Sequence, residues 1–269
     1  TMQLRAALAT LALALIAPLS IAGPLDKTEC IAPAKPGGGS LLNLAQGKFG
    51  RYSEKDVRWL AVIGADYGAV MVTESSPIKS IKDLVAAIKA DPSKIVFGAG
   101  GSVGSQDWMK AALTARASGL DPKTMRFVAF EGGGEAVTAL QGGHVQVYAG
   151  DASEAEEQLK AGTKLRVLAI MADKRLPGPL ANVPTMKELG YDVQWPIVRG
   201  FYVGPKVSDA DFKVWSDTFT KMMATPTFAK LRSERGLFPY ALTGPELERF
   251  VHERVDAYRQ LAAEFHLRV

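Results

Sequence analysis

The hydrophobic positions of the chain alternate between two patterns after Pro24. Short β-rich runs are followed by segments in which apolar residues recur at helical spacing. An alternation of strands and helices predicts an α/β fold. The expected strands are Glu29–Ala32, Val57–Ile63, Ala69–Val72, Lys94–Phe97, Arg126–Phe130, Val145–Ala149, Leu165–Ile170, Val193–Trp195 and Gly200–Val203.

Several helix starts carry a capping pattern, in which a serine or threonine is followed three residues later by an acid. The pairs are Ser80/Asp83, Ser153/Glu156, Thr185/Glu188, Ser208/Asp211 and Thr243/Glu246. The last pair opens the clearest helix, expected over Thr243–Glu264. Its apolar residues share one face: Leu247, Phe250, Val251, Val255, Tyr258, Leu261, Ala262 and Phe265.

The N-terminus has the pattern of a secretory signal. A basic start at Met2–Arg5 precedes an apolar run, Ala6–Ala17, and small residues end at Ala22. The run of about twelve residues is shorter than the roughly 18 that span a bilayer, which favours a cleaved signal over a membrane anchor. We therefore expect residues 1–22 to be removed after Ala22 and the mature protein to be soluble and exported to the periplasm.

Composition and charge narrow the function classes. The apolar content of 47% in 269 residues excludes disorder and allows one large domain or two ordinary ones. The net charge of +4 is too small to indicate nucleic-acid binding. One cysteine, Cys30, excludes a disulfide framework within the chain, and the three histidines are too far apart to show metal-ligand spacing. No cofactor and no metal are expected.

Glycine-rich turns recur where an expected strand is followed by a helix. They are Pro36–Gly39, Gly98–Ser105, Glu131–Glu135 and the shorter Gly150–Asp151. Glycine lets the backbone approach a ligand, and the free N–H groups of a helix's first turn can then face an anion. Any one of these turns could be only a tight connection. Several of them at the carboxyl edge of one sheet favour a shared anion site.

Part of the second turn also matches a hydrolase motif. Gly100–Gly104 reads G-x-S-x-G with Ser102 as the nucleophile, and it lies between an expected strand and an expected helix. His252 or His266 would follow in the right order to act as the base. His252 falls within the last helix, on its expected solvent side, and neither histidine has an identifiable carboxylate partner. A secreted serine hydrolase is therefore the weaker alternative.

A dinucleotide-binding loop is weaker still. The glycines at 98, 100 and 104 lack the regular spacing of that fingerprint, and no acid closes the next expected strand. No residue is assigned to the candidate site on the basis of this motif.

Two groups of charged side chains have open interpretations. Arg199 lies between two apolar strand candidates, where its guanidinium could hold a ligand carboxylate or form a structural ion pair. The acids Glu154, Glu156 and Glu157 are expected to form a solvated helix face.

Long runs of the chain resemble one protein family, the TctC-type tricarboxylate-binding proteins. These are the periplasmic receptors of tripartite tricarboxylate transporters, within the wider Bug family. The runs cover nearly the whole mature chain: Thr28–Gly39, Ser40–Tyr52, Asp56–Leu60, Gly104–Lys110, Phe130–Glu135, Leu176–Gly178 and Trp195–Asp211.

The resemblance implies a two-lobed α/β periplasmic binding protein of type II that closes around citrate or a related tricarboxylate. Residues 23–99 and 200–269 would form lobe one, and residues 100–199 lobe two. Carried over by position, Gly37, Gly38 and Gly39 would bind the ligand from lobe one, and Ser102, Gly104, Ser105, Gln106, Gly132, Gly133 and Gly134 from lobe two. Asp151 and Arg199 are added from the reasoning on residues. The implied partners are a small-molecule carboxylate and the membrane subunits of the transporter. A monomer is expected, and a sensory binding protein is a further alternative.

The chain departs from the family in one place. Gly39 runs directly into Ser40–Leu44, whereas the family has a block of roughly 30 to 50 residues between these points, about the size of a βαβ unit. Cys30 would have lost its partner with that block. Lobe one is therefore expected to be incomplete and to expose apolar faces.

Overall fold

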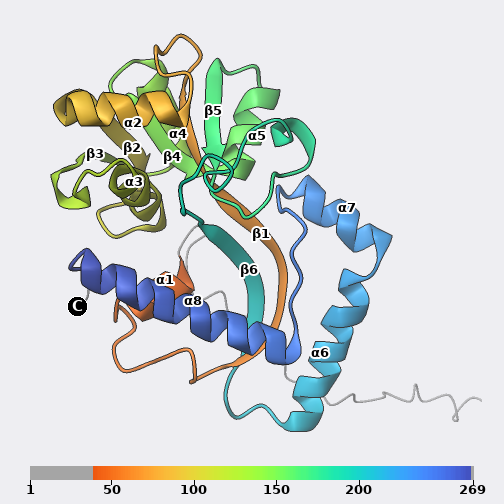
Figure 1. Cartoon of the computed structure of the whole chain (residues 1–269). Helices are drawn as coiled ribbons and strands as arrows, with labels where there is room; N and C mark the ends of the chain where they lie inside the picture. The colour runs from red at the N-terminus through yellow and green to blue at the C-terminus, as the bar shows by residue number, and fades with distance from the viewer. Residues whose placement is uncertain (1–38, 268–269) are drawn as a thin grey trace, which may run out of the picture. The chain divides into compact units, whose positions relative to one another are not determined.

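A computed structural model describes residues 39–267 of the chain (Figure 1). The helices are α1 (Ser40–Ala45), α2 (Ile81–Ala90), α3 (Gln106–Ala117), α4 (Gly133–Gln141), α5 (Ala152–Lys160), α6 (Asp209–Met223), α7 (Pro226–Glu234) and α8 (Gly244–Glu264). The strands are β1 (Arg58–Thr73), β2 (Val96–Gly100), β3 (Arg126–Phe130), β4 (Val147–Asp151), β5 (Leu165–Ile170) and β6 (Pro196–Val203). The expected signal segment 1–22, the expected strand Glu29–Ala32, Cys30, Gly37 and Gly38 lie outside the described residues.

Strand β1 joins two strands that the sequence predicts separately. Its 16 residues run through Gly64 and Gly68, which lie between the two predicted strands, with shifts of register against β6 and β5. The surroundings of Gly68 favour glycine: a Cβ atom there would lie 2.7 Å from Met171 Sδ and 2.8 Å from Lys110 Cδ. A glycine inside a strand often marks such a close approach.

The first half of β1 pairs with β6 and the second half pairs with β4 and β5, in each case antiparallel. The strand order in the sheet is β3-β2-β4-β1-β5, and β2 is parallel to both β3 and β4. The carboxyl ends of β2, β3 and β4 therefore meet at one edge of the sheet. Helices α3, α4 and α5 begin at this edge.

Helices pack on both faces of this sheet, because successive side chains of β1 point in opposite directions. Val70 and Val72 lie in a core cluster with residues of α2 and α3. Ala69 and Met71 lie in a second cluster with residues of α4 and α5. The result is the layered α/β arrangement that the sequence predicts.

The capping pattern predicts some helix starts correctly and others wrongly. Ser80 and Ser208 accept hydrogen bonds from the backbone N–H three residues later, at 3.1 Å in each case, which confirms these starts. The start at Ser153 is wrong. Helix α5 begins at Ala152 with Asp151 as its N-cap, two residues before the predicted cap, and the Ser153 hydroxyl bonds Asp66 instead. Thr185 and Glu188 do exchange hydrogen bonds, but the residues after them form a turn.

The long C-terminal helix is confirmed as α8. Its buried residues, Leu247, Val251, Val255, Tyr258 and Ala262, come from the predicted face. Helix α1 packs against it through Leu42 and Ala45 in the same core cluster (Figure 1).

Helix α6 is covered much less well. None of its residues is buried, and Val214 is 38% exposed. Phe201 of β6 is also 38% exposed and stacks only partly on Phe219, with ring centroids 4.7 Å apart. These exposed apolar side chains agree with the expectation of an incomplete lobe one.

A further prediction differs from the observed structure. Val193–Trp195 is not a strand. The Trp195 N–H donates to the Met171 carbonyl, the Trp195 carbonyl accepts from the Gly68 N–H, and β6 starts only at Pro196. Helix α2 packs against α3, although the sequence assigns its residues to lobe one. The lobe boundaries themselves stay a prediction. Within residues 39–267, no helix has both the length and the apolar character to cross a membrane.

Candidate ligand-binding site

Two of the glycine-rich loops are joined at the carboxyl edge of the parallel strands. The Gly101 N–H donates to the Phe130 carbonyl at 2.8 Å, so the loop after β2 lies beside the loop after β3. A Cβ atom on Gly100 would lie 3.6 Å from the Gly132 Cα. The N-termini of α3 and α4 are therefore neighbours, and the positive ends of two helix dipoles lie close together.

The loop before α3 has a fixed conformation. The Ser105 hydroxyl accepts from Trp108 N–H at 3.2 Å and donates to the Gly100 carbonyl at 3.1 Å, so it caps the helix and closes the turn. Gly104 has φ +82°, which favours glycine. Its carbonyl accepts a buried hydrogen bond of 2.8 Å from Gln46 Nε2, at the end of α1.

Gly39 and Gln106, predicted to bind from different lobes, are brought together. A Cβ atom on Gly39 would overlap the Gln106 side chain, lying 2.8 Å from both its Cγ and its Cδ. Of the triple glycine, only Gly39 is within the described residues. The structure therefore places the end of this predicted loop against the first residue of α3.

The three glycines at the start of α4 have different surroundings. Gly132 is the N-cap residue of α4, and no side chain caps the N-terminus of this helix. A Cβ atom on Gly133 would lie 2.6 Å from the Tyr148 hydroxyl and would overlap Glu154, whereas one on Gly134 would meet open space. Close approach thus requires glycine at 133 but not at 134.

A buried cation lies beneath this edge of the sheet. Lys110 is fully buried, and its Nζ pairs with Asp107 at 2.7 Å and with Asp151. Gly68 stands opposite Asp151 in the β1–β4 register and leaves the space through which the Lys110 side chain passes. Burial opposes the charge on Lys110, but Asp151 and Asp107 together raise its pKa above the ordinary value.

More acids surround this ion pair. Burial raises the pKa of Asp66 to about 6, and the neighbouring Asp151 adds to the shift. Burial and then Asp151 also raise the pKa of Glu154, which accepts a hydrogen bond from the Tyr148 hydroxyl. The prediction that Glu154 belongs to a solvated face is therefore wrong. It lies beneath the N-terminus of α4, beside Gly133.

Lys110, Asp107 and Asp66 are not among the site residues predicted from the sequence. A usable signal was the spacing of Asp107 and Lys110, which are three residues apart and share a face of α3. Arg199 lies on β6 opposite Gly64, and in the described part of the chain no hydrogen bond or ion pair joins it to another predicted site residue. Its role stays a prediction.

The hydrolase alternative gains no support from the described contacts. Ser102 lies on an exposed loop, and no hydrogen bond among the described residues joins it to a histidine. Contrary to expectation, His252 does have a carboxylate neighbour, because its Nδ1 lies 3.5 Å from Glu54. That carboxylate is already held by Arg259, at 3.2 Å and 2.7 Å.

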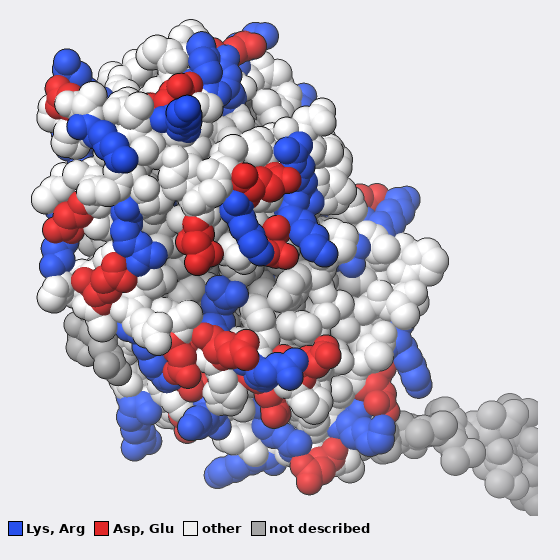
Figure 2. All heavy atoms as spheres, viewed as in Figure 1, with Lys and Arg blue, Asp and Glu red and all other residues white. Residues whose placement is uncertain are grey.

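The site consists of backbone N–H groups, hydroxyls and amides above an internally paired set of charges. Such groups can bind and orient an anion without breaking a bond. Within residues 39–267, no group of three or more His, Cys, Asp or Glu side chains is suited to holding a metal ion. Figure 2 shows basic and acidic side chains interspersed over the face it presents.

Comparison with known proteins identifies the family. The sequence profile described as the tripartite tricarboxylate transporter family receptor, TctC, matches residues 48–267. The UPF0065 protein in the gbd 5' region of Cupriavidus necator is 28% identical over 202 residues, which cover 75% of this chain and 59% of that protein. A UPF0065 protein of Bordetella pertussis is 20% identical over 181 residues, covering 67% and 54%. The chain thus spans less than two thirds of the length of both relatives.

Solved structures show the same fold. A TctC solute binding protein from Polaromonas, solved without ligand, superposes with a TM-score of 0.72 at 22% identity, over 83% of this chain and 75% of that one. MatC from Rhodopseudomonas palustris with bound malate gives 0.65 at 19% identity, over 84% and 80%. Another R. palustris protein, solved with adipate, gives 0.66 at 20% identity, over 78% and 69%. The chain belongs to the TctC family of tripartite tricarboxylate transporter receptors.

Proposed function

We propose that this chain is a periplasmic receptor that captures an organic carboxylate and delivers it to the membrane subunits of a tripartite tricarboxylate transporter. The observation that carries the proposal is the meeting of the α3 and α4 N-termini, with their glycine loops, at one edge of the sheet. Residues 1–22 would direct export to the periplasm. The ligand would be held between lobe one, residues 23–99 and 200–269, and lobe two, residues 100–199, and hinge closure would retain it.

Citrate or a related tricarboxylate is the first candidate ligand. The binding set would be the predicted residues, with Gln106 fixed against Gly39. A dicarboxylate is the second candidate ligand. The proteins solved with malate and with adipate have similar folds.

Thermal unfolding with and without millimolar citrate, malate or adipate tests the proposal. A ligand present at 100 times its Kd adds roughly 2.7 kcal/mol, which raises the Tm by a few degrees. Gln106→Ala should reduce this shift. Gln260→Ala, an exposed residue of α8, should leave it unchanged. If no di- or tricarboxylate raises the Tm beyond chloride at matched ionic strength, the proposal is wrong.

A fluorophosphonate probe addresses the hydrolase alternative in the same preparation. We expect no labelling of Ser102, because no hydrogen bond among the described residues joins it to a histidine that could act as its base. Labelling that disappears in Ser102→Ala would indicate that the chain is an esterase and not a receptor. Transporter membrane genes beside the coding gene would favour transport over a sensory role.

A further inference from the structure

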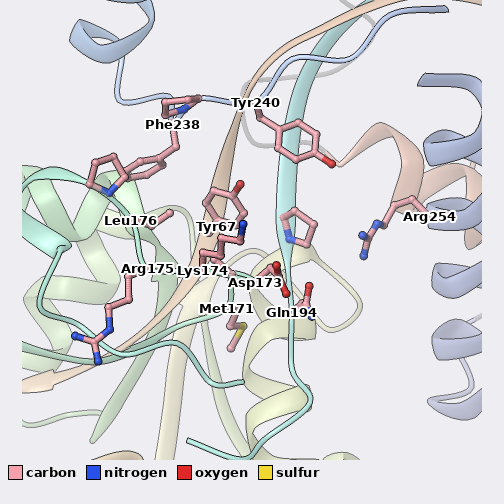
Figure 3. Close-up of a pocket in the computed structure, with 14 residues that line it drawn as sticks. Tyr67, Met171, Asp173, Lys174, Arg175, Leu176, Gln194, Phe238, Tyr240 and Arg254 are labelled. Carbon is pink, nitrogen blue, oxygen red and sulfur yellow. The ribbon is translucent and has the colours of Figure 1, made fainter. Parts of the chain in front are cut away.

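A cavity of about 350 Å³ lies where β1 changes partners (Figure 3). Tyr67 is the last residue of β1 paired with β6, opposite Pro196, and both line the cavity. The remaining walls come from residues 171–177 after β5, Gln194, residues 238–240 before α8, and Arg254 of α8. None of the predicted ligand-binding residues lines it, so the cavity is separate from the site described above.

Aromatic rings form much of its wall. Tyr67 and Phe238 contact each other, with centroids 6.0 Å apart at an interplanar angle of 55°. Figure 3 shows the rings of Tyr67 and Tyr240 directed toward the same space. Flat apolar walls of this kind favour a ligand with an aromatic body, and the volume lies within the range of small-molecule pockets, roughly 300–1,000 Å³.

Arg254 supplies the positive charge. Its guanidinium carbon lies 5.4 Å from the Phe250 ring centroid and 5.9 Å from that of Tyr258, contacts that fix the side chain on α8. Its Nε is buried and has no hydrogen-bond partner within the described residues, and no acid in that part of the chain pairs with it. Figure 3 shows the guanidinium directed into the cavity.

The other charges of the wall are largely matched. Asp173 pairs with Lys187, and Arg175 pairs with Glu188 at 3.0 Å. Lys174 is exposed to solvent. Arg254 is therefore the partly buried cation that can donate two parallel hydrogen bonds to a carboxylate.

We infer that this cavity is a second ligand site, which binds an aromatic monocarboxylate with its ring among Tyr67, Phe238 and Tyr240 and its carboxylate on Arg254. This goes beyond the proposed function, because it uses different residues. A ligand there would contact residues on both sides of the point where β1 leaves β6.

Calorimetric titration of the purified chain with benzoate tests the inference. We expect saturable binding that weakens at least tenfold in Arg254→Gln, in line with the loss of a charge-assisted hydrogen bond. Arg249→Gln is the matched control, since this arginine lies on the same helix and is exposed. Benzyl alcohol, which keeps the ring and lacks the charge, should bind at least tenfold more weakly than benzoate.

Arg254→Lys keeps the charge without the planar fork, and serves as the readout if the glutamine variant does not fold. It should bind benzoate more weakly than wild type. No binding of benzoate by the wild-type chain, or equal binding by the Arg254 variants, would overturn the inference. Gln106→Ala separates the two sites: it should reduce the response to citrate or dicarboxylates and leave benzoate binding unchanged.

Discussion

The side chain of Gln106 lies directly against the backbone of Gly39, in the space that a Cβ atom on the glycine would occupy. Gly39 immediately precedes α1, and Gln106 is the first residue of α3. A second contact reinforces this arrangement, because Gln46 at the end of α1 donates to the Gly104 carbonyl. Gly39 and α1 are therefore held against the start of α3.

Gly39→Ala should displace Gln106 and weaken capture of the ligand. The backbone of Gly39 has φ −74°, which alanine adopts without strain, so the effect should be on binding more than on folding. The Tm shift induced by the best carboxylate measures it. Gly204→Ala, where a Cβ atom meets open space, should keep the full shift.

Gly133→Ala and Gly134→Ala should change stability in opposite directions. At 133 the new methyl group overlaps Glu154 and the Tyr148 hydroxyl, which should cost about 1–3 kcal/mol. At 134 it meets open space within a helix, where alanine stabilises by roughly 0.5–1 kcal/mol relative to glycine. Urea unfolding of the two variants measures the difference. Equal effects would mean that Glu154 does not lie against Gly133.

Lys110→Met should destabilise the chain by about 3–5 kcal/mol, because Asp107 and Asp151 would lose their buried cation. Adding Asp107→Asn should recover part of the loss. Lys123→Met, an exposed lysine, is the matched control and should change the free energy of unfolding little. If Lys110→Met alone is as stable as wild type, the cluster of Lys110, Asp107 and Asp151 is solvated.

Asp66 should make stability depend on pH. Its pKa of about 6 in the folded chain exceeds the ordinary 3.8, so the folded state binds this proton more tightly. The stability gained is fully present below about pH 4 and is lost as the pH rises through about 6, with a limit of about 3 kcal/mol.

Asp66→Asn stays neutral and should lose none of this stability. The free energy of unfolding of the variant, minus that of wild type, should therefore rise between pH 4 and pH 7. Urea unfolding across this range measures it. Asp192→Asn, at an exposed position, should show no such rise; a flat difference for Asp66→Asn would mean that Asp66 ionises normally.

Local patterns predicted local structure well. The strands Arg126–Phe130 and Leu165–Ile170 have the predicted bounds, and Ser80 and Ser208 cap their helices. Each depends on residues within a few positions of one another. The glycine loops that meet at the sheet edge were also predictable, because parallel strands bring their carboxyl ends together.

The errors come from contacts between distant parts of the chain. The sequence predicts two strands that stop on either side of Gly68, because its sequence neighbours do not reveal Met171 and Lys110, whose side chains occupy the space beside it. Asp151 is 41 positions from Lys110, so no local pattern links the two. The predicted start at Ser153 failed for the same reason, since its hydroxyl partner Asp66 is 87 positions away.

The 16 residues of β1 have a consequence for how the chain unfolds. Its first half is the partner of β6, and its second half is the partner of β4 and β5. Among the described strands, β5 and β6 pair with β1 alone, and β4 would keep only its pairing with β2. Unfolding of β1 therefore removes a hydrogen-bonding partner from the strands at both of its ends. The described part of the chain should then lose its structure in a single cooperative step.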